Sequence, residues 1–206
     1  MTGVFITFEG GDGAGKSTQV ARLAEALRAR GHIVVATREP GGTAIAEKIR
    51  EVLLDPANHE MGDRTEALLF AAGRAEHVHH LIRPALERGE IVISDRFMDS
   101  SIVYQGMGRG LGAQDVKGLN MWATGNLKPD LTIILDVEAG FGLDRVGEKD
   151  RIEQASRELH EKVRHGFLQL AAAEPDRYLV VNAQQTIEVI AAEVLARVEQ
   201  LLQAGA

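Results

Sequence analysis

Residues 4–18 read Val-Phe-Ile-Thr-Phe-Glu-Gly-Gly-Asp-Gly-Ala-Gly-Lys-Ser-Thr, and this stretch decides the fold of the 206-residue chain. The apolar run from Val4 to Phe8 predicts a strand, and the residues after Thr18 show a helical pattern. Between them, the segment from Gly10 to Thr18 fits the phosphate-binding pattern G-x-x-x-x-G-K-[ST]. The motif therefore stands in the strand-loop-helix setting that a P-loop requires.

Glycines in such a loop let backbone N–H groups turn toward phosphate oxygens, and the following helix adds the partial positive charge of its N-terminus. Lys16 can then reach the β and γ phosphates of ATP, and Ser17 can hold Mg²⁺. The plainer alternative is an ordinary glycine-rich turn, which the complete motif and both flanks disfavour. We expect all nine loop residues to contact the nucleotide: Gly10, Gly11, Asp12, Gly13, Ala14, Gly15, Lys16, Ser17 and Thr18.

The length and composition indicate one α/β domain over residues 1–206. The net charge is −7, from 23 basic and 30 acidic residues, which disfavours a broad nucleic-acid surface. The chain has no cysteine, so disulfides and cysteine-based zinc sites are excluded. No apolar run approaches the length of a membrane span, and the N-terminus lacks a signal-peptide pattern. We expect a soluble, cytoplasmic protein that binds neither nucleic acid nor membrane.

Short apolar runs alternate with helical patterns, which is typical of a parallel sheet covered on both faces. The helix after the P-loop carries an apolar stripe at Val20, Leu23, Ala24 and Leu27, and a closing helix of about four turns begins near Ile187. The sequence predicts five strands: Val4 to Phe8, Ile33 to Thr37, Ile91 to Ser94, Leu131 to Val137 and Tyr178 to Val181.

Asp95 and Arg96 follow the third predicted strand directly. Ligands of parallel α/β sheets bind beyond the carboxyl ends of the strands, so both residues are placed to act on a phosphate. Asp95 would supply the carboxylate that holds Mg²⁺, and the planar guanidinium of Arg96 suits a phosphate group. A structural ion pair at a strand end is the alternative, and the P-loop makes it the weaker one.

The second predicted strand leads into Arg38-Glu39-Pro40-Gly41-Gly42-Thr43. Pro40 and the glycine pair force a turn, a cis peptide bond before Pro40 fits it, and Thr43 is a suitable N-cap for the next helix. We interpret Arg38 as a second phosphate ligand that faces the acceptor. The alternative is a surface turn with a solvated arginine.

Together these segments resemble bacterial thymidylate kinases over nearly the whole chain. The resemblance rests on the P-loop and on Arg38 to Thr43, Asp95-Arg96-Phe97, Tyr104-Gln105-Gly106 and Asp150-Arg151-Ile152-Glu153, in that order. It implies a P-loop NTPase-type three-layer fold, with a five-stranded parallel sheet flanked by helices. It also implies transfer of the γ-phosphoryl group of ATP to dTMP, giving dTDP, with Mg²⁺ as cofactor and a homodimer as the assembly.

By the same resemblance, Phe70 is similar to the ring that stacks on thymine, and Arg74 to the donor to the base carbonyl. The two lie at i and i+4, so one helix face presents both to one planar ligand. A core position for Phe70 is the alternative on burial statistics.

Other residues resemble the family's contacts to the nucleoside. Tyr104 is similar to the ring beneath the deoxyribose, and Glu9 to the acidic residue near the sugar 3′-hydroxyl and the metal. The residues that resemble the family's contacts around the pyrimidine edge are Ser100, Ser101 and Gln105.

The mobile lid of the family corresponds to about residues 145–153. Family members carry a catalytic arginine either in the P-loop or in the lid, and here the P-loop position is Asp12. Arg151 is therefore our first candidate for the catalytic cation, with Lys149 and Arg145 behind it; Arg145 is also expected at the nucleotide. This lid is a few residues shorter and has fewer arginines than in familiar bacterial members. Solvated, paired helix charges are the alternative.

Some signals point elsewhere. His77, His79 and His80 are interpreted as a partly exposed helix surface or a subunit contact rather than a metal site, and Trp122 as core or interface. The rival functions are another nucleoside monophosphate kinase, a P-loop switch that needs no second phosphate pocket, and a nucleic-acid binder already disfavoured by charge.

Overall fold

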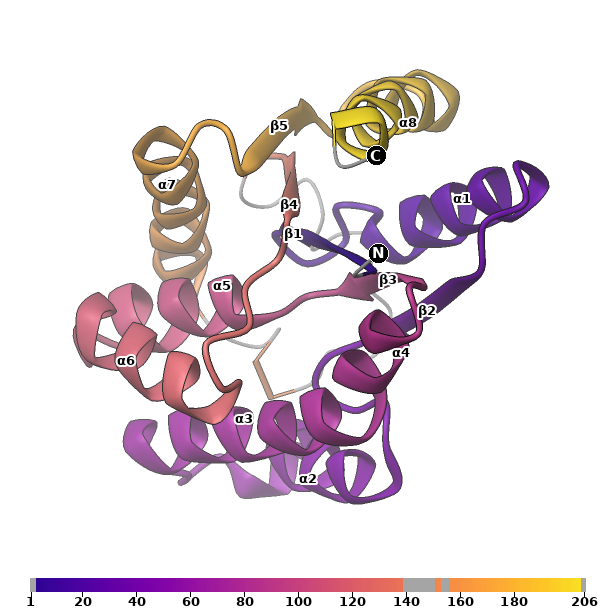
Figure 1. The fold of residues 1–206 in the computed structure, drawn as a ribbon. Coiled ribbons are helices and arrows are strands. Elements are labelled where there is room, and N and C mark those ends of the chain that lie inside the picture. The colour runs from indigo at the N-terminus through magenta and orange to yellow at the C-terminus, as the bar shows by residue number, and fades with distance from the viewer. Residues whose placement is uncertain (1–2, 139–150, 153–155, 205–206) are drawn as a thin grey trace.

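The fold is built on five parallel strands in the order β2-β3-β1-β4-β5, as seen in a computed structural model that describes residues 3–138, 151–152 and 156–204 (Figure 1). The predicted five-stranded parallel sheet is thereby confirmed, with boundaries shifted by one or two residues. The strands are β1 (Val4–Gly10), β2 (Val34–Arg38), β3 (Ile91–Asp95), β4 (Leu131–Asp136) and β5 (Tyr178–Asn182).

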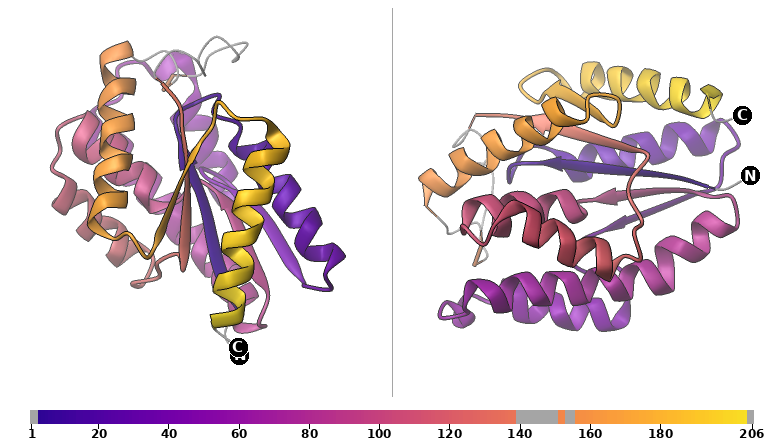
Figure 2. Two further views of the ribbon diagram at one scale, coloured as in Figure 1. Left: turned by 90° about the horizontal axis from the view of Figure 1, so that it is seen from above. Right: turned by 60° about the vertical axis from the view of Figure 1, so that its left-hand side comes forward.

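Helices cover both faces of this sheet (Figure 2). Alternation along β1 explains the layers, because Ile6 and Phe8 pack with α1 and α8 on one face while Phe5 packs with η2, α4 and α5 on the other. The helical elements are α1 (Lys16–Ala29), α2 (Ala44–Leu54), η1 (Pro56–Asn58), α3 (Asp63–His77), η2 (Val78–Ile82), α4 (Arg83–Glu87), α5 (Met98–Ser101), η3 (Ile102–Gly108), α6 (Ala113–Ala123), α7 (Arg157–Ala173) and α8 (Ile187–Ala204).

Strand register places the polar strand ends side by side. Phe8 of β1 and Arg38 of β2 both stand opposite Asp95 of β3. Gly10 ends β1 with φ +137, and a Cβ there would lie 2.5 Å from the carbonyl oxygen of Leu135. Glycine therefore lets β1 stay paired with β4 while the chain turns into the P-loop.

Trp122 was predicted in the core or at an interface; its 82% exposure excludes the core, and the interface stays a prediction. The burial prediction for His77 is wrong. His77 is fully buried, whereas a partly exposed surface was predicted for the histidine cluster. Burial is tolerated there because both ring nitrogens have partners, namely Thr37 and Glu39. Among the described helices, none combines the length and apolar character needed to cross a bilayer.

Candidate functional site

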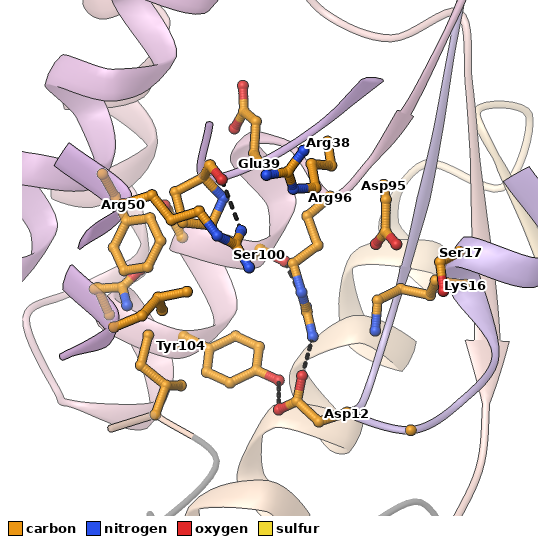
Figure 3. A pocket seen from close by; sticks show the side chains of 17 residues that line it. Asp12, Lys16, Ser17, Arg38, Glu39, Arg50, Asp95, Arg96, Ser100 and Tyr104 are labelled. Carbon is orange, nitrogen blue, oxygen red and sulfur yellow. Dashed lines mark hydrogen bonds and ion pairs between the residues drawn. The ribbon is translucent and has the colours of Figure 1, made fainter. Parts of the chain in front are cut away.

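A cavity of about 340 Å³ lies beyond the carboxyl ends of β1, β2 and β3 (Figure 3). It brings together most of the residues that the sequence predicted for the site, from four separate segments of the chain. Its lining consists of Asp12, Gly13, Lys16, Ser17, Arg38, Glu39, Pro40, Arg50, Leu54, Phe70, Asp95, Arg96, Ser100, Ser101, Tyr104, Gln105 and Ile152.

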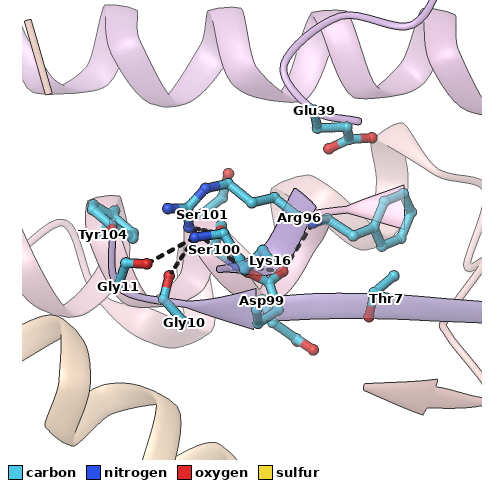
Figure 4. Close-up of polar contacts among 12 residues, drawn as sticks. Thr7, Gly10, Gly11, Lys16, Glu39, Arg96, Asp99, Ser100, Ser101 and Tyr104 are labelled. Atoms are coloured by element: carbon cyan, nitrogen blue, oxygen red, sulfur yellow. Dashed lines mark hydrogen bonds and ion pairs between the residues drawn. The ribbon is translucent and has the colours of Figure 1, made fainter. Parts of the chain in front are cut away.

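The P-loop side of the cavity presents Lys16, Ser17 and Asp95. The Lys16 ammonium donates to the carbonyl oxygens of Gly10 (3.2 Å) and Gly11 (2.8 Å), so its side chain is turned back over its own loop (Figure 4). Burial lowers the pKa of Lys16 to about 8, with Arg96 adding to the effect. The nearby carboxylates of Asp12, Asp95 and Glu9 favour the charged ammonium but do not offset its burial, and an anionic ligand would favour it further.

Arg96 is held in an unusual backbone conformation at the centre of the site. Its φ is +70, a region that non-glycine residues rarely adopt and that costs on the order of 1–3 kcal/mol. Its N–H donates to the carbonyl oxygen of Phe8 (2.9 Å), and the Ser94 hydroxyl donates to its carbonyl oxygen (2.8 Å). These two bonds lock the turn that directs the guanidinium into the cavity, where it donates to the Ser100 hydroxyl (2.9 Å).

Asp12 is the P-loop residue that faces Arg96. Its carboxylate accepts from Arg96 (2.5 Å) and from the Tyr104 hydroxyl (3.1 Å), as the dashed lines in Figure 3 show. Burial works against its charge, but Arg96 and Lys16 outweigh it and hold the pKa of Asp12 below its usual value. The sequence showed only that Asp12 is no catalytic cation; its tie to Arg96, 84 residues away, left no local signal.

Glu9, at the end of β1, has a fully buried carboxylate. It accepts hydrogen bonds from the backbone N–H groups of Phe97 (2.8 Å) and Ser100 (3.2 Å), and from the Ser100 hydroxyl (2.5 Å). Burial nevertheless raises the pKa of Glu9 to about 7, although Arg96 opposes the shift. A carboxyl group with a pKa near neutrality is able to exchange a proton at working pH.

The loop after β2 has the predicted form. The peptide bond before Pro40 is cis, and the Thr43 hydroxyl caps α2 by accepting from the N–H of Ala46 (3.3 Å). Arg38 lines the cavity with a half-exposed guanidinium that pairs with Glu47 (3.0 Å). Arg50, which the sequence analysis missed, also lines it and donates to the Pro40 carbonyl oxygen (2.7 Å). No local pattern distinguishes Arg50 from the other basic residue of α2, Lys48.

Phe70 and Arg74, predicted to meet one ligand, take different positions on α3. Phe70 is half-buried and lines the cavity, whereas Arg74 is not among the described lining residues. Arg74 is 2% exposed and donates to Glu39 (2.6 Å), the Ser101 hydroxyl (3.0 Å) and the Phe97 carbonyl oxygen (3.0 Å). It stands behind the cavity wall, and its contact with a base stays a prediction.

The remaining predicted nucleoside contacts, Ser100, Ser101, Tyr104 and Gln105, all line the cavity. Gln105 is positioned by Glu66 of α3, which accepts from its amide (2.9 Å). Glu66 is 1% exposed, and no sequence pattern marked it.

Arg151 lies next to the cavity but outside its described lining, to which the neighbouring Ile152 belongs. Its guanidinium pairs with Glu66 (2.7 Å) and donates to the Leu53 carbonyl oxygen (2.8 Å). A role at the transferring phosphoryl group requires the guanidinium to leave these partners, and this role stays a prediction. Arg145 and Lys149, the other proposed lid cations, lie outside the described residues.

Comparisons with known proteins point to one family. The family model described as thymidylate kinase matches residues 8–194. A thymidylate kinase of Clavibacter sepedonicus is 53% identical, with 100% of this chain and 99% of the relative covered. One of Symbiobacterium thermophilum is 54% identical over 97% of this chain and 94% of the relative. The crystal structure of thymidylate kinase from Ehrlichia chaffeensis superposes with a TM-score of 0.80 at 36% identity, covering 97% of this chain and 99% of that one.

Proposed function

The chain belongs to the thymidylate kinase family, and we propose that it transfers the γ-phosphoryl group of ATP to dTMP, giving dTDP and ADP. One observation carries the proposal. A single cavity is lined by the P-loop residues Lys16 and Ser17 and, opposite them, by the arginines Arg38 and Arg96. A protein that only binds or hydrolyses a triphosphate needs no second phosphate pocket, whereas a monophosphate kinase does.

The donor phosphates would be held by the P-loop. Its backbone N–H groups bind phosphate oxygens, and the Lys16 ammonium exchanges the carbonyl oxygens of Gly10 and Gly11 for the β and γ phosphates. Burial lowers the pKa of Lys16, and the negative charge of a bound phosphate would raise this pKa again and so stabilise the ammonium form.

Mg²⁺ fits the residues present. The Ser17 hydroxyl and the Asp95 carboxylate line the same cavity, and such hard oxygen ligands suit this ion. Bound there, the ion would neutralise charge on the β and γ phosphates. Removing it with EDTA should abolish turnover, and added Mg²⁺ should restore it.

The acceptor phosphate would lie between Arg38 and Arg96. Arg96 is aimed into the cavity by its locked backbone, and its contacts with Asp12 and Ser100 set the direction of the guanidinium. Phe70, Tyr104, Ser100, Ser101 and Gln105 would then enclose the nucleoside. In-line transfer needs little covalent work from the protein, so catalysis consists of alignment and charge stabilisation.

Glu9 is the available proton acceptor in this arrangement. Its pKa of about 7 in the free protein and its place beside Arg96 suit a group that holds the sugar 3′-hydroxyl or takes a proton during transfer. We assign the catalytic work to Lys16, Asp95, Arg96 and Glu9, with Arg151 as the cation supplied from outside the cavity.

A coupled assay that follows ADP release with added monophosphates tests the proposal. We expect turnover with ATP and dTMP, and far slower turnover with AMP or CMP. If AMP were the best acceptor, another nucleoside monophosphate kinase would be the correct assignment. ADP release that is independent of any monophosphate would instead indicate a P-loop switch or hydrolase.

We further propose a homodimer formed through α3 and α6. Leu68 on α3 is 57% exposed and Trp122 on α6 is 82% exposed, and a shallow pocket of about 260 Å³ lies between these helices. Large exposed apolar side chains in one region favour an interface. Light scattering should give twice the chain mass, and Leu68→Asp should give monomers. A cytoplasmic location is proposed with it, because ATP is supplied there.

A further inference from the structure

A buried polar network lies directly behind the loop that presents Arg38. Its members are Thr37 and Glu39 from the β2 end, and Arg74 and His77 from α3. The side chains of Glu39, Arg74 and His77 are 3% exposed or less. Buried polar groups are costly unless fully paired, so such a cluster at the edge of a site calls for an explanation.

His77 sits at the centre of the network with both ring nitrogens engaged. Nδ1 lies 3.0 Å from Glu39 Oε1, and Nε2 lies 2.8 Å from the Thr37 hydroxyl. Since an ionised carboxylate only accepts, we assign Nδ1–H as the donor to Glu39, and Nε2 forms the second hydrogen bond with the Thr37 hydroxyl. The ring therefore fixes one oxygen of the Glu39 carboxylate.

Glu39 uses its other oxygen to hold Arg74 Nε at 2.6 Å. Arg74 in turn donates to Ser101 (3.0 Å) and to the Phe97 carbonyl oxygen (3.0 Å), and it also bonds Asn120. Ser101 lines the cavity. Figure 3 shows the Glu39 carboxylate turned away from Arg96 and Asp12. The carboxylate bonds Arg74 and His77, so we assign its charge to this network and not to the binding of substrate phosphates.

The loop that follows Arg38 packs directly against the His77 ring. Gly42 has φ +88, and a Cβ there would lie 2.5 Å from His77 Nε2 and 2.8 Å from the Thr37 hydroxyl. The Glu39 N–H donates to the Asp95 carbonyl oxygen (2.8 Å), which ties the same loop to the end of β3. Any displacement of His77 or Glu39 must therefore move the loop that carries Arg38.

We propose that His77 and Glu39 are positioning residues for the acceptor, fixing the Arg38 loop and the Arg74–Ser101 wall in one geometry without touching the substrate. The inference rests on the proposed function and deepens it. It predicts that damage to the network weakens monophosphate binding and spares ATP, because the P-loop shares none of these bonds.

Two isosteric variants of one residue test the inference. An asparagine amide reaches the place of Nδ1 and keeps the contact with Glu39, whereas a glutamine amide reaches the place of Nε2 and keeps only the contact with Thr37. In His77→Gln we expect KM for dTMP to rise about tenfold or more, since a hydrogen bond to a charged group is lost. KM for ATP should stay within about twofold, and His77→Asn should lie much closer to the wild type. His80→Gln, at an exposed position three residues away, is the matched control.

Equal dTMP defects in the two variants, or a parallel rise of KM for ATP, would overturn the inference, because a merely structural role predicts one of these. If His77→Gln does not fold, as judged by thermal unfolding, Glu39→Gln must give the same selective rise in KM for dTMP. A wild-type protein that uses a different monophosphate refutes the proposed function alone, and the variants are then compared on that substrate. A wild-type protein that binds no monophosphate refutes both.

Discussion

The two halves of the cavity are built in different ways. The donor half is one continuous segment, Gly10 to Ser17, which offers backbone N–H groups to phosphates and whose Lys16 ammonium donates to carbonyl oxygens of its own loop. The acceptor half is assembled from β2, α3, β3 and α5, and its side chains are fixed by buried ion pairs such as Arg74 with Glu39. The donor half can therefore change partners on binding, whereas the acceptor half is largely set before the ligand arrives.

The difference has a physical reason. Every nucleoside triphosphate offers the same phosphates, and backbone N–H groups suffice to hold them. Selecting one monophosphate requires side chains in fixed places, because specificity depends on groups that a wrong ligand leaves unpaired. We therefore expect acceptor-half substitutions to damage stability and donor-half substitutions to damage turnover.

The largest expected effect is in the acceptor half. Arg74→Leu leaves the Glu39 carboxylate buried without its charged partner, which should lower the free energy of unfolding by about 3–5 kcal/mol. Arg22→Leu is the control, since Arg22 and its partner Glu188 are 46% and 68% exposed. Its cost should stay below about 1 kcal/mol. Urea unfolding measures both values, and similar losses in the two variants would contradict the contrast.

The second effect is in the donor half. Lys16→Met should lower kcat by about 10²- to 10³-fold, because one charge that stabilises the transferring phosphoryl group is lost. Its stability should not fall, since burial already disfavours the ammonium. Lys162→Met on α7, an exposed lysine, should change neither quantity. Turnover and thermal unfolding on the same samples check this, and a strongly destabilised Lys16→Met would remove the distinction between the halves.

The same contrast explains what the sequence could predict. The P-loop, the five strands and the Thr43 cap follow from local patterns, and the structure has all of them. The pairs that build the acceptor half join residues far apart in sequence, such as Glu39 with Arg74, and no local pattern specifies which residues will meet.

The error on His77 has the same origin. Its burial was misjudged because helical spacing shows which residues share a face but not what covers that face. The ion pair of Arg74 with Glu39, 35 residues away, is likewise invisible to local spacing, while the predicted contact of Arg74 with a base stays a prediction.

The third effect is a pH dependence that belongs to the donor half and the adjoining strand end. The pKa of Glu9 is raised from 4.5 to about 7, so the folded state binds a proton more tightly than the unfolded state. The contribution of Glu9 to the free energy of unfolding is fully present below pH 4.5. It falls by up to roughly 3 kcal/mol as the pH rises through 7. Lys16, with its pKa lowered from 10.5 to about 8, acts oppositely, and stability rises from pH 8 to 10.5.

Unfolding curves measured across pH separate the two groups. Glu9→Gln should reduce the decrease in the free energy of unfolding between pH 4.5 and 7. Lys16→Met should reduce its increase above pH 8. Glu25→Gln, at an exposed position on α1, should leave both slopes in place. A Glu9→Gln protein with the wild-type slope would mean that other groups set the pH dependence.

The smallest effect, and the one that connects the halves, concerns Arg151. In the proposed mechanism the Arg151 guanidinium leaves Glu66 and reaches the phosphoryl group during transfer. Arg151→Ala should then lower kcat by at least about tenfold, which corresponds to about 1.4 kcal/mol. The change in nucleotide affinity should be smaller. Glu66→Gln distinguishes this role from simple anchoring. Because Glu66 also holds Gln105, its loss should raise KM for dTMP while leaving kcat near the wild-type value. If Glu66→Gln lowered kcat as much as Arg151→Ala, the pair would act as an anchor, and the catalytic cation would have to come from elsewhere in the chain.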